Sequence, residues 1–174
     1  MLRRAAAEPD AFVLGLDANA AAMADASRRT TPAGRRGALP NAIFVASAVE
    51  AAPAALAGRA SDVSVTFPWG SLLRGVLGCD EAVLTGLAGL LEPGGRLEAL
   101  VSLAARDAHA AGLDPARLDD LAAIGAAWAS AGLCLADVRT ATIGQIAASG
   151  SSWSKRLRAA DGRPIRRLVG FAEP

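Results

Sequence analysis

The tryptophan of the stretch FPWGSLL, Trp69, is the first residue whose type and place suggest chemistry. The β-branched residues 62–66 before it predict a buried strand, and Pro68 ends that strand because proline cannot donate a ladder hydrogen bond. Ser71 then offers a side-chain cap for a helix over 72–77. Trp69 is therefore expected at the carboxyl end of a strand, the edge at which open α/β sheets bind ligands. The alternative is a packing role at the strand end, which is common for large aromatic residues.

A carboxylate, Asp17, occupies a comparable place earlier in the chain. It follows residues 11–16 (AFVLGL), whose apolar run predicts a buried strand. A carboxylate at a strand end of an α/β sheet can accept hydrogen bonds from the hydroxyl groups of a ribose. Asp17 could instead cap the Ala-rich helix that the sequence predicts over 19–29.

The elements that would position these side chains alternate along the chain. Strands are predicted at 11–16, 42–46, 62–67, 96–103, 133–142 and 165–171, and helices at 2–7, 19–29, 49–56, 72–77, 80–91 and 118–131. This alternation predicts a parallel, doubly wound sheet. A polar segment, 144–163, joins the last two strands, which are therefore expected to form an antiparallel pair at one edge. We expect an α/β class I (Rossmann-like) methyltransferase fold, with a mostly parallel sheet and an antiparallel C-terminal edge strand.

Composition narrows the classes of function. At 174 residues the chain is expected to be one domain, and its net charge of +1 means that any nucleic-acid surface must come from local clusters. Cys79 and Cys134 match no metal-site spacing and are expected to be free thiols in a reducing cytoplasm. The single histidine, His109, is expected on a surface loop and argues against a His-based metal site or a Ser-His-Asp triad. We expect no signal peptide, and no apolar run is long enough to span a bilayer.

Five stretches carry a resemblance to one family. They are Gly15–Asn19 (GLDAN), Phe44–Pro53, FPWGSLL, Pro93–Gly95 (PGG) and Ser152–Leu157 (SWSKRL). Over nearly the whole chain they resemble the 16S ribosomal RNA adenine-N1 methyltransferases that give aminoglycoside resistance. FPWGSLL and SWSKRL are specific in combination, whereas PGG occurs in many methyltransferases. The resemblance implies S-adenosyl-L-methionine as the methyl donor and N1 of the decoding-site adenine, in the 30S subunit, as the target.

The resemblance also implies which residues hold the cofactor. Asp17 would bind its ribose, and Val49 and Glu50 would border its adenine. Thr66 and Ser71 would line the pocket that the cofactor shares with the target base. No metal is expected.

Two tryptophans, by the same resemblance, would sandwich the target adenine. Trp69 and Trp153 would stack on a base that has been flipped out of its helix, because a base inside helical RNA is inaccessible. Stacking contributes about 1–3 kcal/mol per base and offsets much of the cost of unstacking. Adenine N1 carries a lone pair at neutral pH, so alignment with the methyl carbon is expected to suffice without a general base. The alternative for Trp153 is a buried anchor, although its neighbours are polar, and Trp128 is expected in the core.

Two basic clusters lie where the family contacts rRNA. The first is Arg28, Arg29, Arg35 and Arg36, and the second is Lys155, Arg156, Arg158 and Arg163. Exposed arginines often only face solvent, but these lie on loops near the expected active edge. Phosphate contacts from these loops would position the enzyme on the subunit and make binding salt-dependent.

The chain departs from the family at its start. The family's first strand and the Gly-rich D-x-G-x-G loop after it do not occur upstream of Asp17. That strand is expected between the strands that end at Asp17 and Phe67, and without it two inner strand edges are unpaired. We expect a true start further upstream, because the motifs that follow are intact, and the alternative is a degenerate, truncated copy. The alternative functions are a non-catalytic remnant that docks on RNA and a small-molecule methyltransferase, and a monomer is expected.

Overall fold

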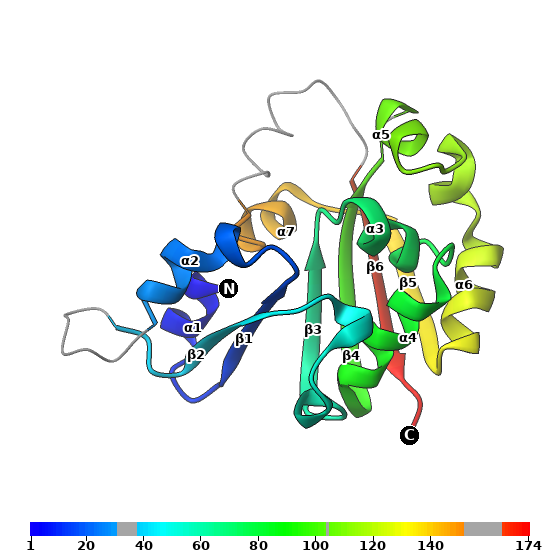
Figure 1. Cartoon of the computed structure of the whole chain (residues 1–174). Coiled ribbons are helices and arrows are strands. Elements are labelled where there is room, and N and C mark those ends of the chain that lie inside the picture. The colour runs from blue at the N-terminus through cyan, green and yellow to red at the C-terminus, as the bar shows by residue number, and fades with distance from the viewer. Residues whose placement is uncertain (31–37, 104, 152–164) are drawn as a thin grey trace. The chain divides into compact units, whose positions relative to one another are not determined.

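The computed structural model of the chain describes residues 1–30, 38–103, 105–151 and 165–174. These residues form two units, Met1–Pro53 and Ala54–Pro174 (Figure 1). Each unit has its own β-sheet. The single domain expected from the chain length stays a prediction.

The first unit is built on two parallel strands. Its elements are α1 (Leu2–Ala7), β1 (Val13–Asp17), α2 (Ala20–Arg28), β2 (Ala42–Ala46) and the 3₁₀ turn η1 (Val49–Ala51). Asp17 at the end of β1 lies opposite Ala46 at the end of β2. Gly15 is required beside Phe44, because a Cβ atom on Gly15 would lie 2.7 Å from the phenyl ring. The parallel pairing brings the carboxyl ends of both strands to one edge.

The second unit contains a four-stranded sheet. Its elements are η2 (Ala54–Leu56), β3 (Ala60–Thr66), α3 (Gly70–Val76), α4 (Glu81–Leu90), β4 (Leu91–Ser102), α5 (Ala105–Ala110), η3 (Pro115–Asp119), α6 (Leu121–Ser130), β5 (Leu133–Thr140), α7 (Ile143–Ala148) and β6 (Ile165–Ala172). The strand order is β3-β4-β6-β5, with β3 parallel to β4 and β6 antiparallel to both of its neighbours. The carboxyl ends of β3, β4 and β5 therefore share one edge with the start of β6.

The C-terminal strand lies inside the sheet, not at its edge. The predicted antiparallel pair, β5 and β6, is confirmed, but β6 is its inner member and β5 forms the edge. The prediction of an antiparallel C-terminal edge strand is therefore wrong. The burial pattern gives the physical reason: Leu168, Val169 and Gly170 are consecutive buried residues, which suits a strand covered on both faces, whereas β5 alternates with exposed positions.

Two predicted elements have different bounds in the structure. The helix predicted over 49–56 is two separate 3₁₀ turns, η1 and η2, because Pro53 between them has no N–H with which to continue a helix. The strand predicted from residue 96 begins at Leu91. The PGG stretch lies at an irregularity in the pairing of β3 with β4: Ala60 pairs with Leu91, and the regular pairing resumes with Asp62 opposite Arg96. In addition, His109 lies exposed in the last turn of α5, not on a loop.

Within the described residues, β1 pairs only with β2 and β3 pairs only with β4. An unpaired edge presents N–H and C=O groups that a further strand can satisfy. The family strand expected between β1 and β3 stays a prediction.

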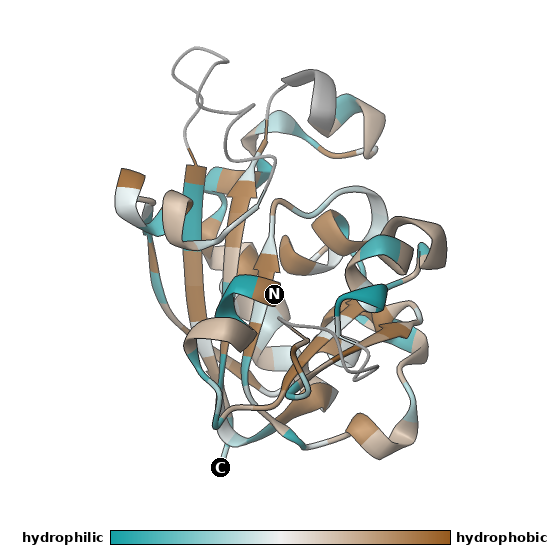
Figure 2. Cartoon of the chain, turned by 90° about the vertical axis from the view of Figure 1, so that its left-hand side faces the viewer, coloured by the Kyte–Doolittle hydropathy of each residue, from teal (hydrophilic) through white to brown (hydrophobic). Residues whose placement is uncertain are grey.

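The apolar core of the second unit lies between its sheet and the helices α3, α4 and α6. The strands are largely brown, and so hydrophobic, in Figure 2. Trp128 of α6 is fully buried, as predicted, and its indole N–H donates to the carbonyl of Val76 in α3 at 2.9 Å. Its ring packs against Gly170 of β6, where a Cβ atom would lie 2.8 Å from the ring and 2.6 Å from the carbonyl oxygen of Cys134.

Gly170→Ala is therefore expected to lower the free energy of unfolding by about 1–3 kcal/mol, because the added methyl group forces backbone or the indole to move. Gly89→Ala is the matched control: nothing lies within 4 Å of its added Cβ, and α4 gains a better helix former. Urea denaturation of both variants measures the difference. Equal midpoints for the two variants would contradict the packing described for Trp128.

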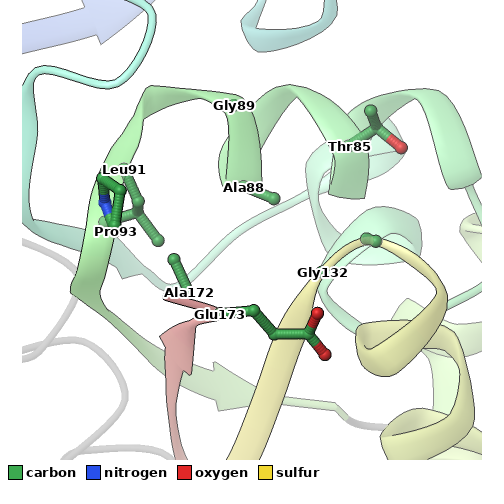
Figure 3. Close-up of a pocket in the computed structure, with 9 residues that line it drawn as sticks. Thr85, Ala88, Gly89, Leu91, Pro93, Gly132, Ala172 and Glu173 are labelled. Atoms are coloured by element: carbon green, nitrogen blue, oxygen red, sulfur yellow. The ribbon is translucent and has the colours of Figure 1, made fainter.

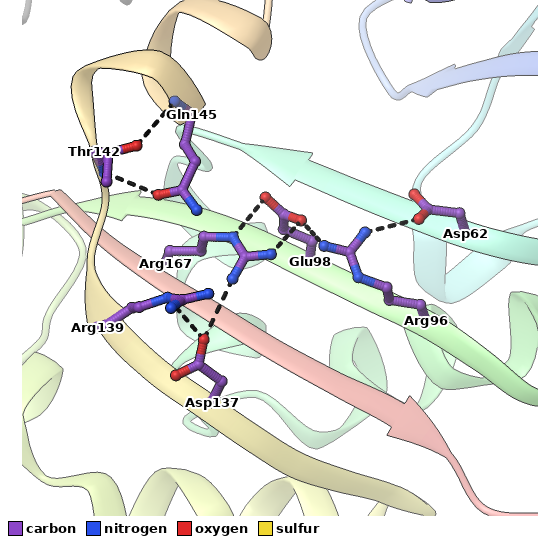
Figure 4. Close-up of polar contacts among 8 residues, drawn as sticks. All are labelled: Asp62, Arg96, Glu98, Asp137, Arg139, Thr142, Gln145 and Arg167. Carbon is purple, nitrogen blue, oxygen red and sulfur yellow. Dashed lines mark hydrogen bonds and ion pairs between the residues drawn. The ribbon is translucent and has the colours of Figure 1, made fainter. Parts of the chain in front are cut away.

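The other face of the four-stranded sheet carries a row of charged side chains (Figure 4). It runs through all four strands as Asp62, Arg96, Glu98, Arg167, Asp137 and Arg139, each paired with its neighbour. Arg167 holds Glu98 through two bonds of 3.0 and 3.1 Å, and it reaches Asp137 at 3.3 Å. Three arginines thus neutralise three carboxylates, so this row contributes no net charge with which to attract phosphates.

Candidate active site

The Trp69 ring projects from the carboxyl edge of the four-stranded sheet. It directly precedes α3 and is 59% exposed, whereas Pro68 before it is buried. A core residue of this size would be covered, so the packing alternative for Trp69 is wrong. An exposed indole on a loop fixed by a strand and a helix is a surface on which a planar ring can stack.

Phe67 gives the turn before Trp69 its shape. Its backbone N–H still donates to the carbonyl of Leu100 in β4 at 2.8 Å, which extends the ladder of β3 by one residue. Its φ is 52°, and it is the only non-glycine residue of the described ranges with a positive φ. Such a conformation costs roughly 1–3 kcal/mol for a bulky residue, so surrounding contacts must hold it.

Thr66 and Ser71 flank this turn on the same edge. Thr66 is half-buried at the end of β3, and Ser71 is exposed in the first turn of α3. The prediction that Ser71 caps α3 is wrong. The helix begins one residue earlier, at Gly70, and Trp69 is the N-cap residue without a side-chain cap. Gly70 has a φ of 57°, which glycine tolerates without a steric penalty. The Ser71 hydroxyl is therefore not used as the helix cap.

Asp17 ends β1 with an exposed carboxylate. Its Oδ1 atom accepts a hydrogen bond from the N–H of Asn19 at 2.8 Å, which fixes the orientation of the side chain. The cap of α2 is Asn19, whose side chain accepts from the N–H of Ala22 at 3.1 Å. The capping alternative for Asp17 is therefore wrong, and its carboxylate retains lone pairs for a hydroxyl ligand.

Val49 and Glu50 lie on the turn that follows the neighbouring strand. Val49 is half-buried and Glu50 is exposed in η1. The hydroxyl of Ser47 donates to the carbonyl of Ala51 at 2.8 Å, and the N–H of Ser47 donates to the carbonyl of Asp17 at 3.1 Å. In the first unit, Asp17 and η1 therefore lie at the same edge of the two-stranded sheet. This edge carries the carboxylates of Asp17 and Glu50 and the apolar side chain of Val49.

The basic residues divide between described and undescribed parts of the chain. Arg28 is largely exposed and pairs with Asp25 one turn away, and Arg29 is exposed directly after α2. The other predicted RNA contacts, and the second tryptophan, lie outside the described residues: Arg35, Arg36, Trp153, Lys155, Arg156, Arg158 and Arg163. Their roles stay predictions.

A pocket of about 310 Å³ opens at the opposite edge of the second unit (Figure 3). It is lined by small and apolar residues at the end of α4 and the start of β5, with Thr85 and Glu173 as its polar side chains. It contains none of the residues of the carboxyl edge. We therefore place the candidate site at Trp69 and not at this pocket.

His, Cys, Asp and Glu side chains are the usual protein ligands of metal ions. No group of three or more of them gathers in the described part of the chain in a way that could hold a metal ion. Cys79 and Cys134 are free thiols, as predicted. None of the helices in the described ranges is long and apolar enough to cross a membrane.

Two features of this edge were missed by sequence reasoning. The first is α7, which overlaps the start of the segment 144–163 that was predicted to join the last two strands, and which begins with a capping box of Thr142 and Gln145. The spacing T-x-x-Q was a usable signal for a helix start. The second is Ser102 at the end of β4, whose buried hydroxyl has no hydrogen-bond partner among the described residues. No local pattern could have indicated it.

Known proteins that are similar to this chain are rRNA methyltransferases. The family model described as NpmA: 16S rRNA (adenine(1408)-N(1))-methyltransferase matches residues 1–171. The 16S rRNA (adenine(1408)-N(1))-methyltransferase of Streptoalloteichus tenebrarius is 32% identical over 171 residues, which cover 95% of this chain and 79% of that protein.

Solved structures of resistance methyltransferases share the fold. The antibiotic-resistance methyltransferase Kmr is similar with a TM-score of 0.78 and 35% identity, covering 99% of this chain and 81% of that one. The W203A mutant of the 16S rRNA (adenine(1408)-N(1))-methyltransferase from Catenulisporales acidiphilia, solved with its cosubstrate SAM, has a TM-score of 0.78 and 29% identity, covering 99% and 80%. The predicted class I methyltransferase fold is thereby confirmed. With a family model that matches nearly every residue, this chain belongs to the 16S rRNA (adenine(1408)-N(1))-methyltransferase family.

Proposed function

We propose that this chain transfers the methyl group of S-adenosyl-L-methionine to N1 of adenine 1408 in the 16S rRNA of the 30S subunit. Methylation there would give resistance to aminoglycosides, as it does in the family. The observation that carries the proposal is an exposed Trp69 at the carboxyl edge of a sheet in a chain of this family. We further propose that it acts in the cytoplasm, where its ribosomal substrate would be, and that it does so as a monomer without metal.

The residues of the first unit fit a nucleoside ligand. The exposed Asp17 carboxylate, oriented by the Asn19 N–H, is suited to accept hydrogen bonds from ribose hydroxyls. Val49 offers an apolar contact for the adenine ring of the cofactor, with Glu50 at its border. Thr66 and Ser71, in the second unit, are proposed to line the cofactor and target pocket. When bound, S-adenosyl-L-methionine would supply a methyl group on a sulfonium, from which the neutral thioether is a good leaving group.

The task of the protein residues is then alignment. Adenine N1 has a free lone pair at neutral pH, so no side chain needs to remove a proton before the methyl group is transferred. Trp69 would stack on one face of the flipped adenine and Trp153 on the other, so that N1 is held in the plane between them. Holding both reactants in one orientation is the main source of acceleration in such a site.

The proposal is tested by incubating 30S subunits, free 16S rRNA and small-molecule extracts with the chain and radiolabelled S-adenosyl-L-methionine. Label is expected in the intact 30S subunit. Label only in small molecules would favour a small-molecule methyltransferase. Tight 30S binding without label would indicate a remnant that docks on RNA without catalysis.

The arginine pair Arg35 and Arg36 gives a separate prediction about docking. Changing both to alanine is expected to weaken 30S binding and to flatten its dependence on salt by about one to two units of slope, because two phosphate contacts are lost. The affinity for S-adenosyl-L-methionine should not change. Filter binding over a range of salt concentrations measures the slope, and a loss of cofactor affinity with normal subunit binding would show that this loop has another role.

A further inference from the structure

The strained turn at Phe67 lies against an apolar cluster built from β4, α7, β6 and the residue that follows β5. Phe67 packs against a cluster formed by Leu100 of β4, Ala141 after β5, Ile146 of α7 and Ile165 of β6. Those four residues are 4–8% exposed. The turn that presents Trp69 therefore depends on contacts with residues that are distant in the sequence.

Phe67 is also restricted by its neighbour. A residue before proline normally takes an extended conformation with a negative φ, yet Phe67 before Pro68 has a φ of 52°. A smaller side chain at position 67 would leave the cluster and lose the contacts that hold this conformation. The direction of the chain at Trp69, two residues later, is thus set by the Phe67 ring.

The same cluster holds α7 in place. This helix has only six residues, too few to be stable by itself. It is held by its capping box, in which the Thr142 hydroxyl accepts from the Gln145 N–H at 3.2 Å and the Gln145 side chain accepts from the Thr142 N–H at 2.8 Å. Its one buried residue, Ile146, packs in the cluster beside Phe67.

Two of the segments in this cluster, the turn at Phe67 and α7, precede Trp69 and Trp153 in the sequence. Trp69 follows Phe67 after one residue, and in the sequence Trp153 follows the end of α7, Ala148, within a few residues. The backbone beside the cluster is tied as well, since the N–H of Ala141 donates to the carbonyl of Ile165 at 2.7 Å.

We infer that Phe67 is a positioning residue that acts through Trp69, and that Ile146 couples its orientation to α7. This inference rests on the proposed function for its effect on methyl transfer. The orientation of Trp69 itself is independent of that function and can be measured in the free protein.

The test labels the chain with 5-fluorotryptophan, whose three indoles give three ¹⁹F resonances, with that of Trp69 assigned by Trp69→Phe. Phe67→Gly, which tolerates a positive φ but lacks the ring, and Ile146→Ala are both expected to shift or broaden the Trp69 resonance. Phe67→Leu should restore most of its position, because it keeps an apolar side chain in the cluster. The control is Val101→Ala, a fully buried residue on the opposite face of β4, which should leave the Trp69 resonance in place.

Methyl transfer supplies the second measurement. With 30S subunits under single-turnover conditions, Phe67→Gly is expected to slow the reaction about 10-fold while 30S affinity changes less than about twofold, since orientation and not docking is lost. In a Trp69→Ala background the same change should have no further effect. An unmoved Trp69 resonance in both Phe67→Gly and Ile146→Ala, or an equal loss of rate in the Trp69→Ala background, would overturn the inference. If the variants shift the Trp69 resonance as expected but the wild-type chain does not methylate 30S subunits, only the proposed function is overturned.

Discussion

Trp69→Ala is expected to slow methylation of the 30S subunit about 10- to 100-fold, because one stacking face for the flipped adenine contributes about 1–3 kcal/mol. The ring is exposed and belongs to no core, so the fold should tolerate its removal. The affinity for the 30S subunit should be nearly unchanged, since phosphate contacts carry most of docking. Trp69→Phe should retain part of the rate, because a smaller ring still stacks.

Trp128→Phe is the contrasting variant. This indole is fully buried and donates to the Val76 carbonyl, so its replacement should lower thermal stability and leave the transfer rate per folded molecule unchanged. Trp153→Ala is expected to behave as Trp69→Ala does. Single-turnover assays with saturating cofactor distinguish a tryptophan that stacks on the target base from one that only stabilises the core. Wild-type rates in both Trp69→Ala and Trp153→Ala would contradict the stacking mechanism.

Asp17→Asn is expected to weaken the affinity for S-adenosyl-L-methionine about 10- to 100-fold, the range typical of losing a hydrogen bond to a charged group. Asparagine keeps an oxygen that can accept from the Asn19 N–H at the position of Oδ1, so the turn after β1 should remain intact. The lost affinity would then report the ligand contact and not a change of fold.

Isothermal titration measures that affinity, and Asp25→Asn is the matched control. Asp25 is an exposed carboxylate of α2 whose partner is Arg28, so its neutralisation should leave cofactor binding unaltered. Equal dissociation constants for the wild type and Asp17→Asn would show that the ribose is held elsewhere.

The features that the sequence predicts well are those that depend on a short run of consecutive residues. An apolar run that ends in a carboxylate located Asp17 at the end of β1, and a β-branched run that ends in proline located Trp69 at the end of β3. An apolar helical pattern placed Trp128 in the core. In each case the pattern spans only a few neighbouring residues, and the structure agrees with the position that it predicts.

The features that were missed depend on contacts across the chain. No local pattern reveals that β6 pairs between β4 and β5, because this follows from the burial of both its faces. The six-residue α7 is stable only with its cap and the cluster around Ile146. The cap of α3 was assigned to Ser71 by residue type, whereas the helix begins at Gly70 with Trp69 as its N-cap residue.

The measurement that tests the proposed activity most directly is reverse transcription across the decoding region of 16S rRNA, recovered from 30S subunits incubated with this chain and S-adenosyl-L-methionine. A methyl group on N1 blocks base pairing, so the account predicts a strong stop one nucleotide before adenine 1408, on its 3′ side, that weakens with Trp69→Ala. Read-through at that adenine, with labelled methyl groups at another nucleotide or in no RNA at all, would contradict the account.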